Sequence, residues 1–163
     1  MFILKCWFHI CMHIRYLFFK AIYGNRFCAG KHTTWRKGFS VMINKGATIF
    51  IGKDCFFNNY CSINALHSIV IGDGTIMGEN VKIYDHNHKF GNINIPLKEQ
   101  GYSIGKVTIG NNCWIGSNVV ILKDVTIGDN VTVAAGTVVA RSIPSCKLAK
   151  NKSSIEYIDI LTK

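Results

Sequence analysis

A six-residue period constrains the fold of this 163-residue chain more than any other feature. Aliphatic residues stand six apart from Ile109 to Val139, and the segments between them resemble one another, as in IGNNCW, IGSNVV and IGDNVT. The same spacing recurs upstream in two runs: Ile51, Phe57, Ile63 and Ile69, and Ile71, Met77 and Ile83. Repetition at a fixed short period indicates a chain that stacks identical structural units.

The positions within each six-residue unit have distinct physical roles. The fourth residue after each aliphatic one is small or β-branched, which suits short strands packed around a narrow core: Cys113, Val119, Val125, Val131 and Thr137. The third residue after it belongs to the types that accept a positive φ, which predicts a corner: Asn112, Asn118, Asp124, Asn130 and Gly136. Three such corners close a triangular coil of eighteen residues, as from Ile109 to Ile127.

Stacked coils of this kind form parallel sheets, so we predict an all-β solenoid. Small cysteines at inward positions, Cys55, Cys61 and Cys113, are expected to fill its core rather than bind metal. Seven cysteines with no C-x-x-C pair argue against a disulfide framework and a zinc ribbon, and favour a reducing, cytoplasmic setting.

The period breaks after Ile83 and resumes only at Ile109, so a loop spanning about residues 84–106 is expected to leave the solenoid. Long loops in compact domains usually carry function. The loop opens with the sequence DHNH at residues 85–88. Two shorter breaks, at residues 49–51 and 69–71, are expected only to adjust corners.

The positive charge of the chain is concentrated at its N-terminus. The formal net charge is +10, and residues 1–53 contain no Asp or Glu. Within residues 1–23, apolar side chains recur at helical spacing, which predicts a basic amphipathic helix: Ile3, Trp7, Ile10, Ile14, Leu17 and Ala21. We expect this helix to pack on the end of the domain, with a position on a membrane surface as the alternative. No signal peptide or membrane span is expected, and no motif indicates nucleic acid binding.

One domain is therefore expected, in three parts. Residues 1–38 form the N-terminal basic helical segment, residues 39–145 the solenoid with its active-site loop 84–106, and residues 146–163 a C-terminal tail.

Residues 107–144, VTIGNNCWIGSNVVILKDVTIGDNVTVAAGTVVARSIP, resemble the hexapeptide-repeat acyltransferases, which fold as a left-handed parallel β-helix. The resemblance covers about residues 40–145 and is closest to the sugar O-acetyltransferase branch, which includes galactoside, maltose and surface-polysaccharide acetyltransferases. It implies acetyl-CoA as co-substrate, a carbohydrate acceptor, no metal, and a homotrimer whose subunits share each active site.

Acetyl transfer to a sugar hydroxyl needs a general base, and a neutral imidazole suits that task. By the Asp-x-x-His pattern of the family, the resemblance assigns this role to His88, with His86 as the alternative. Asp85 either orients the imidazole or binds hydroxyls of the acceptor. No G-x-S-x-G motif is present, so no covalent enzyme intermediate is expected.

The resemblance also assigns residues to the substrates. It places Trp114 beside the cleft, next to the coenzyme, although subunit packing would explain this outward side chain as well. Ser117, Ala135 and Arg141 match positions that line the coenzyme A groove, and Asn58 matches an acceptor-side asparagine.

The C-terminal motif departs from the family. After IPSCKLAK the family usually has Gly-x-Pro-Ala-Lys, whereas this chain has Asn151, Lys152, Ser153 and Ser154. Lys147, Lys150 and Lys152 are therefore candidates for the missing phosphate contact.

Two other functions remain open at this point. A γ-carbonic-anhydrase-like metal hydratase would use His67, His86 and His88, although an H-x-H pair does not match the wide spacing of that family's ligands. An inactive trimeric scaffold is the non-enzymatic alternative. The favoured prediction is an acetyl-CoA-dependent O-acetyltransferase acting on a surface glycan or its precursor, including lipid- or phosphate-linked forms at the inner face of the membrane.

Overall fold

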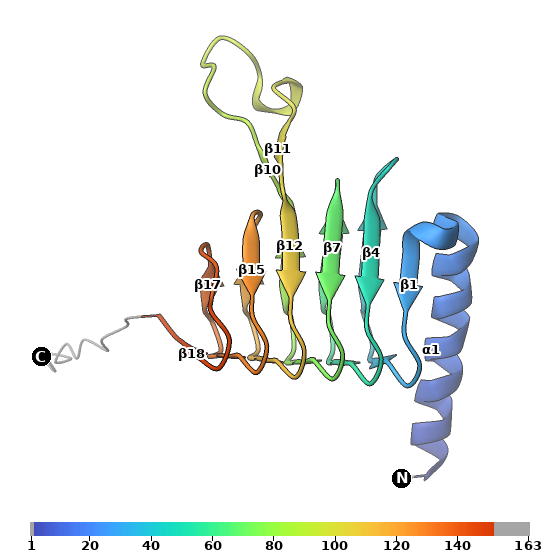
Figure 1. Ribbon diagram of the computed structural model, residues 1–163. Helices are drawn as coiled ribbons and strands as arrows, with labels where there is room; N and C mark the ends of the chain where they lie inside the picture. Colours follow the sequence, from blue (N-terminus) through green and yellow to red (C-terminus); the bar gives the residue numbers. More distant parts are fainter. Residues whose placement is uncertain (1, 152–163) are drawn as a thin grey trace, which may run out of the picture.

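The computed structural model describes the backbone of residues 2–151 and the side chains of residues 10–151. An N-terminal helix, α1 (Phe2–Tyr23), stands at one end of a stack of triangular coils, and the short 3-10 helix η1 (Gly24–Arg26) leads from it into the first coil (Figure 1). The stack is a left-handed parallel β-helix. The six-residue period predicted the parallel solenoid, and the family resemblance predicted its left hand.

Three parallel sheets form the faces of the solenoid. Face 1 consists of β1 (Phe27–Ala29), β4 (Thr48–Ile51), β7 (Ser68–Ile71), β12 (Lys106–Ile109) and β15 (Val125–Ile127). Face 2 consists of β2 (Thr34–Trp35), β5 (Phe56–Phe57), β8 (Ile76–Met77), β13 (Trp114–Ile115), β16 (Thr132–Val133) and β18 (Leu148–Ala149). Face 3 consists of β3 (Ser40–Ile43), β6 (Ser62–Ala65), β9 (Lys82–Tyr84), β14 (Val120–Ile121) and β17 (Val138–Val139).

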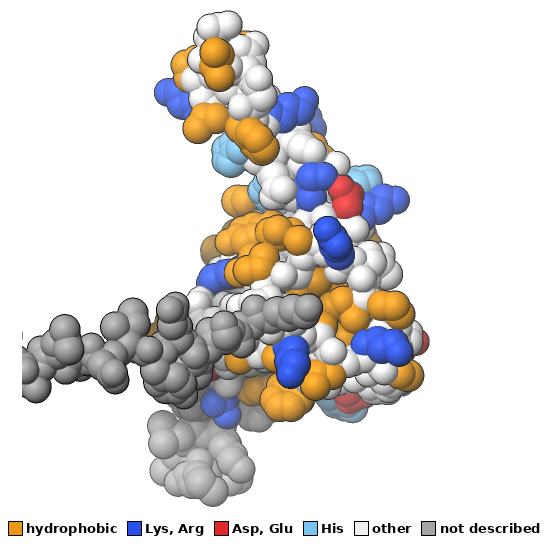
Figure 2. Space-filling model, turned by 90° about the vertical axis from the view of Figure 1, so that its left-hand side faces the viewer, with side chains coloured by type: hydrophobic (Ala, Val, Ile, Leu, Met, Phe, Trp, Pro, Cys, Tyr) orange, Lys and Arg blue, Asp and Glu red, His pale blue; other side chains and the backbone are white. Residues whose placement is uncertain are grey.

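Between β9 and β12 the chain leaves the solenoid as a hairpin. Its strands, β10 (His86–His88) and β11 (Tyr102–Ile104), are antiparallel, and the 3-10 helix η2 (Leu97–Glu99) lies between them. The hairpin projects well beyond the body of the solenoid in both views (Figures 1 and 2). The excursion expected in this part of the chain is therefore an ordered arm.

The predicted corners are confirmed by the backbone. All five corner residues have a positive φ: Asn112 (52°), Asn118 (59°), Asp124 (63°), Asn130 (55°) and Gly136 (70°). Short polar side chains and glycine tolerate this conformation, so the chain turns at each of them without large strain.

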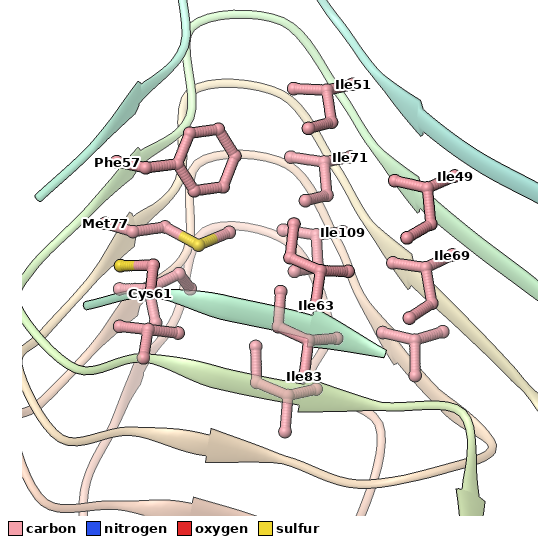
Figure 3. Packing of buried hydrophobic residues seen from close by; sticks show 14 of the residues in the cluster. Ile49, Ile51, Phe57, Cys61, Ile63, Ile69, Ile71, Met77, Ile83 and Ile109 are labelled. Carbon is pink, nitrogen blue, oxygen red and sulfur yellow. The ribbon is translucent and has the colours of Figure 1, made fainter. Parts of the chain in front are cut away.

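The core consists of columns of stacked side chains. Ile51, Ile71 and Ile109 lie in register on face 1, and Phe57 lies above Met77 on face 2 (Figure 3). The predicted inward cysteines are confirmed: the Sγ atoms of Cys55, Cys61 and Cys113 each lie 3.1 Å from a glycine carbonyl oxygen of the following coil, those of Gly72, Gly78 and Gly128. Burial raises the pKa of all three thiols.

The solenoid extends further in both directions than the period indicated. Its first strand begins at Phe27, before residue 39, and β18 continues face 2 beyond residue 145. The first coil keeps the six-residue spacing at Ala29, Trp35 and Val41, which pair with Ile51, Phe57 and Ile63. Aromatic residues fill much of its interior in place of isoleucines. Trp35 and Phe39 stack with ring centroids 5.0 Å apart, and Phe39 lies 5.0 Å from Phe57.

Helix α1 covers the open end of this aromatic core, as expected for a helix packed on the domain. Phe19 is buried, and its ring centroid lies 5.3 Å from that of Phe27. Met12, Tyr16 and Tyr23 pack beside it. The face predicted from helical spacing is a different one: Ile10, Ile14 and Leu17 are exposed on the outside. The side chains of Ile3 and Trp7 lie outside the described residues.

Candidate active site

The predicted catalytic residues lie at the root of the hairpin, on the edge where face 3 turns into face 1. Across the two hairpin strands, His86 is opposite Ile104 and His88 is opposite Tyr102. Because side chains alternate along a strand, the two histidines point to the same side of the hairpin.

Asp85 is fully buried at this edge, and both of its carboxylate oxygens are occupied. It accepts hydrogen bonds from the backbone N–H groups of Leu66 (2.8 Å), His67 (2.7 Å) and Ser68 (2.9 Å) at the corner one coil earlier. Its Oδ1 atom also lies 3.0 Å from Nδ1 of His86. Of the two roles expected for Asp85, the structure supports orientation of the imidazole, because a carboxylate without exposed surface has no access to acceptor hydroxyls.

The contact with Asp85 determines what His86 can do. A carboxylate only accepts hydrogen bonds, so it favours the tautomer of His86 with hydrogen on Nδ1. This tautomer leaves the lone pair of Nε2 free. The side chain of His86 is 13% exposed, and its ring meets that of Tyr102 edge-on, with centroids 5.4 Å apart. A fixed, partly sheltered imidazole with a free Nε2 is suited to general-base chemistry.

His88 lacks such a partner. It is exposed, and its ring lies 4.5 Å from that of Tyr102. Within the described part of the chain, its ring nitrogens make no hydrogen bond to a side chain or to the backbone. The family pattern favoured His88, whereas the carboxylate contact distinguishes His86. The signal in the sequence was the direct Asp-His neighbour pair at a corner position.

Trp114 lies on face 2, where its side chain is 56% exposed. In the strand register it stands between Ile76 and Thr132. Phe56, Ile76, Trp114 and Leu148 are the apolar members of one outward row that crosses this face. The row offers a flat apolar surface to a ligand or another subunit.

Ser117 and Ala135 lie on a different edge, where face 2 turns into face 3. At several corners of the solenoid, a backbone N–H donates to a side-chain oxygen of the next coil. On this edge, Glu79 N donates to Ser117 Oγ at 3.1 Å, and on the edge between faces 1 and 2, Asp129 N donates to Ser145 Oγ at 2.9 Å. Ala135 has no such oxygen, and the N–H of Ser117 finds no acceptor among residues 10–151. This edge therefore presents a free backbone donor beside a small side chain.

The remaining predicted residues are dispersed. Asn58 lies on the same edge as Ser117, where its Oδ1 atom accepts the N–H of Asn59 at 2.9 Å in a local turn. Arg141 is exposed on the solenoid edge from which the hairpin projects, and Lys150 is exposed after β18. Lys152 lies outside the described residues.

Within one subunit, the described histidines are not grouped as metal ligands. In the part of the chain that the structure covers with side chains, no three His, Cys, Asp or Glu side chains lie close enough together to hold a metal ion. His67 contributes only its backbone N–H to Asp85 in this region.

Comparison with known proteins assigns the fold to a family. Residues 106–141 match the family described as bacterial transferase hexapeptide (six repeats). A maltose O-acetyltransferase from Clostridium difficile superposes with a TM-score of 0.67 at 31% identity, over 86% of this chain and 75% of that one. The chain belongs to the hexapeptide-repeat acetyltransferases.

Two further members of the hexapeptide-repeat acetyltransferases extend the comparison. Galactoside O-acetyltransferase of Escherichia coli is 38% identical over 106 residues, which are 64% of this chain and 50% of that protein. A galactoside acetyltransferase in complex with coenzyme A superposes with a TM-score of 0.64 at 30% identity, over 81% of this chain and 64% of that one. The chain spans between a third and about half of the length of the first curated relatives that it matches.

Proposed function

We propose that this protein is an acetyl-CoA-dependent O-acetyltransferase that acetylates a sugar hydroxyl of a surface glycan or its precursor, with His86 as general base. The observation that carries the proposal is the 3.0 Å contact between His86 Nδ1 and the buried carboxylate of Asp85. Relatives named galactoside and maltose O-acetyltransferases support the class of acceptor. The complex of one relative with coenzyme A supports the donor.

In the proposed reaction, Nε2 of His86 takes the proton of the acceptor hydroxyl as its oxygen attacks the thioester carbonyl. Collapse of the tetrahedral intermediate breaks the carbon–sulfur bond, and His86 returns the proton to the sulfur of coenzyme A. Asp85 stabilises the imidazolium that forms in between. The developing oxyanion needs a donor, and the free N–H of Ser117 is suited to that role.

His86 and the N–H of Ser117 lie on different edges of one subunit. We therefore propose a homotrimer in which the hairpin of one subunit reaches the Ser117 edge of the next, the edge where face 2 turns into face 3. The hairpin carries exposed apolar side chains, Phe90 (79%), Ile93 (96%) and Leu97 (61%), which favour burial against another surface. Figure 2 shows hydrophobic side chains gathered at its far end. The apolar row on face 2 offers a matching surface.

The coenzyme would lie along the Ser117 edge. We propose that the backbone at Ser117 and Ala135 holds its pantetheine arm and that Trp114 packs beside it. Lys150 on this edge, or Lys152, would pair its phosphates, together with Arg141 from the hairpin edge of the adjacent subunit. The acceptor site then lies between these residues and His86, with Asn58 near it.

The location remains part of the proposal. The six described cysteines are free, which is consistent with the reducing, cytoplasmic setting expected from the sequence. In residues 2–151, no helix is long and apolar enough to cross a lipid bilayer. We propose peripheral contact with the inner face of the membrane through α1.

Two measurements test the proposed function. Acetyl-CoA at about a hundred times its dissociation constant should stabilise the fold by about 2.7 kcal/mol and raise the thermal midpoint by about 5–10 °C. Release of free coenzyme A thiol should then be followed with galactosides and maltose as acceptors.

Variants of the two histidines form a matched pair on one strand. His86→Gln should lower kcat about 10²–10⁴-fold with an unchanged donor-induced thermal shift, and His88→Gln should cause a much smaller loss. The reverse order would assign the base to His88. A folded protein with neither a thermal shift nor acetyl transfer would refute the proposed function.

A further inference from the structure

We propose that the outer face of α1 is a docking surface for an anionic lipid bilayer. This outer face consists of five apolar residues that are at least half exposed: Ile10 (52%), Ile14 (62%), Leu17 (66%), Phe18 (59%) and Ile22 (50%). At about 100° per residue they lie on one arc of the helix, opposite the inward side chains of Phe19 and Tyr16. An exposed apolar stripe of this length requires a partner surface.

Basic residues border this arc on both sides. Arg15 lies at one border, where its Nη1 atom donates to the carbonyl of Phe39 at 3.0 Å. Lys20 lies toward the other, where its Nζ atom donates to the carbonyls of Gly24 (3.0 Å) and Phe27 (3.3 Å). Neither forms a salt bridge with a described carboxylate, and residues 1–53 contain no acid. An apolar arc with flanking cations is the pattern of helices that lie in a membrane interface.

The position of α1 suits a flat partner. The helix runs along the end of the coil stack, and no other described element lies beyond it (Figure 1). Its whole length can therefore rest on a planar surface while the solenoid extends away from that surface.

The charge distinguishes a bilayer from a second copy of the chain. Two outer faces packed against each other would bring Arg15 and Lys20 of both copies together, with no acid in residues 1–53 to compensate them. Anionic headgroups would instead neutralise these cations, and each contributes favourably near such a surface.

The same geometry narrows the acceptor class, and this step rests on the proposed function. The hairpin leaves the coil of β7, which lies two strand spacings from β1 on face 1. With a spacing of about 4.8 Å and a helix about 10 Å wide, His86 would lie roughly 20 Å from the membrane surface. This distance fits the glycan part of a lipid-linked saccharide, with its lipid end in the bilayer.

Vesicle sedimentation of the full-length protein tests the docking surface. We expect binding to vesicles of phosphatidylcholine mixed with phosphatidylglycerol, little binding to phosphatidylcholine alone, and weaker binding at high salt. The double variant Ile14→Gln/Leu17→Gln should reduce binding at least tenfold. The control Val138→Gln removes an exposed apolar side chain (53%) from β17, at the end of the stack far from α1, and should leave binding unchanged.

The outcomes separate the proposals. Absence of wild-type binding to the mixed vesicles, or unchanged binding of the double variant, would overturn the docking surface. A lower molar mass of the double variant than of the wild-type protein by light scattering, without any vesicle binding, would show that the outer face joins two copies. That result would also overturn the docking surface. The thermal shift with acetyl-CoA, measured on the same variants, reports folding and donor binding independently of the membrane.

Discussion

The carboxylate of Asp85 holds both the corner one coil earlier and the imidazole of His86. Its two oxygens accept the N–H groups of residues 66–68, and Oδ1 lies 3.0 Å from Nδ1 of His86. The β-helix and the proposed base therefore depend on one buried side chain.

Asp85→Asn should damage both functions at once. The amide nitrogen would face backbone N–H donors, which leaves buried groups without partners and should cost about 1–3 kcal/mol of unfolding free energy. The imidazole would also lose the carboxylate that stabilises its protonated form, so we expect kcat to fall by a larger factor than KM changes. Urea unfolding and steady-state kinetics measure the two effects; a stable variant with full activity would contradict both roles.

Ala135→Ser should weaken donor binding without weakening the fold. A serine Oγ here would accept the N–H of Ser117, as Ser145 Oγ accepts that of Asp129 at 2.9 Å. We expect an equal or higher thermal midpoint and a several-fold higher Kd for acetyl-CoA by calorimetry. Ser145→Ala is the matched opposite change on another edge, and should lower stability by about 1 kcal/mol with the Kd unchanged. Unaltered donor affinity in Ala135→Ser would remove the Ser117 N–H from the proposed site.

Gly116→Ala should destabilise the coil stack. A Cβ atom at this position would lie 2.5 Å from the backbone nitrogen of Ala135, so the two coils would have to separate. A cost of about 2–3 kcal/mol corresponds to a fall of about 5–10 °C in thermal midpoint. Gly91→Ala, where a Cβ atom meets open space, is the control and should change little. Equal midpoints for the two variants would show that the stack tolerates the wider spacing.

The buried thiols predict a loss of stability in alkali. Burial raises the pKa of Cys55, Cys61 and Cys113 above the ordinary value of 9.0. At pH values between the ordinary thiol pKa and the raised pKa of the native protein, the unfolded chain has lost its thiol protons and the native protein retains them. The free energy of unfolding therefore falls as pH rises. Each thiol contributes up to about 1.4 kcal/mol per pH unit in that window.

Urea unfolding between pH 8 and pH 10.5 measures this slope, with Cys61→Ala as the comparison. The variant should show a shallower decline than the wild-type protein, because one titrating thiol is absent. Parallel curves would show that Cys61 ionises equally in both states.

The repeating part of the fold was predictable from local chemistry. Asn118 and Asn130 lie at corners because their short side chains tolerate a positive φ. Ile115 and Ile121 lie inside because a period of six residues brings each to the equivalent inward position on successive faces of the triangle. The first coil was not predicted, because aromatic residues such as Trp35 and Phe39 stand at its inward positions, where the other coils have mostly aliphatic ones.

The hairpin that carries the candidate site was predictable, but the contacts that distinguish its two histidines were not. The broken period located the hairpin, and the sequence DHNH identified two candidate bases. Only the fold brings the N–H groups of residues 66–68 to Asp85 and thereby fixes His86 beside it.

The sequence by itself determined the β-helix, since each corner and inward position depends on a residue and its near neighbours. The tertiary structure decided which side of α1 is buried. The helical spacing favoured the side with Ile10, Ile14 and Leu17, and this prediction was wrong. The other side is buried instead, because the aromatic end of the core, formed by Phe27 and Trp35, accommodates Phe19. Choices between locally equivalent surfaces depend on packing partners distant in the chain, and these exist only after folding.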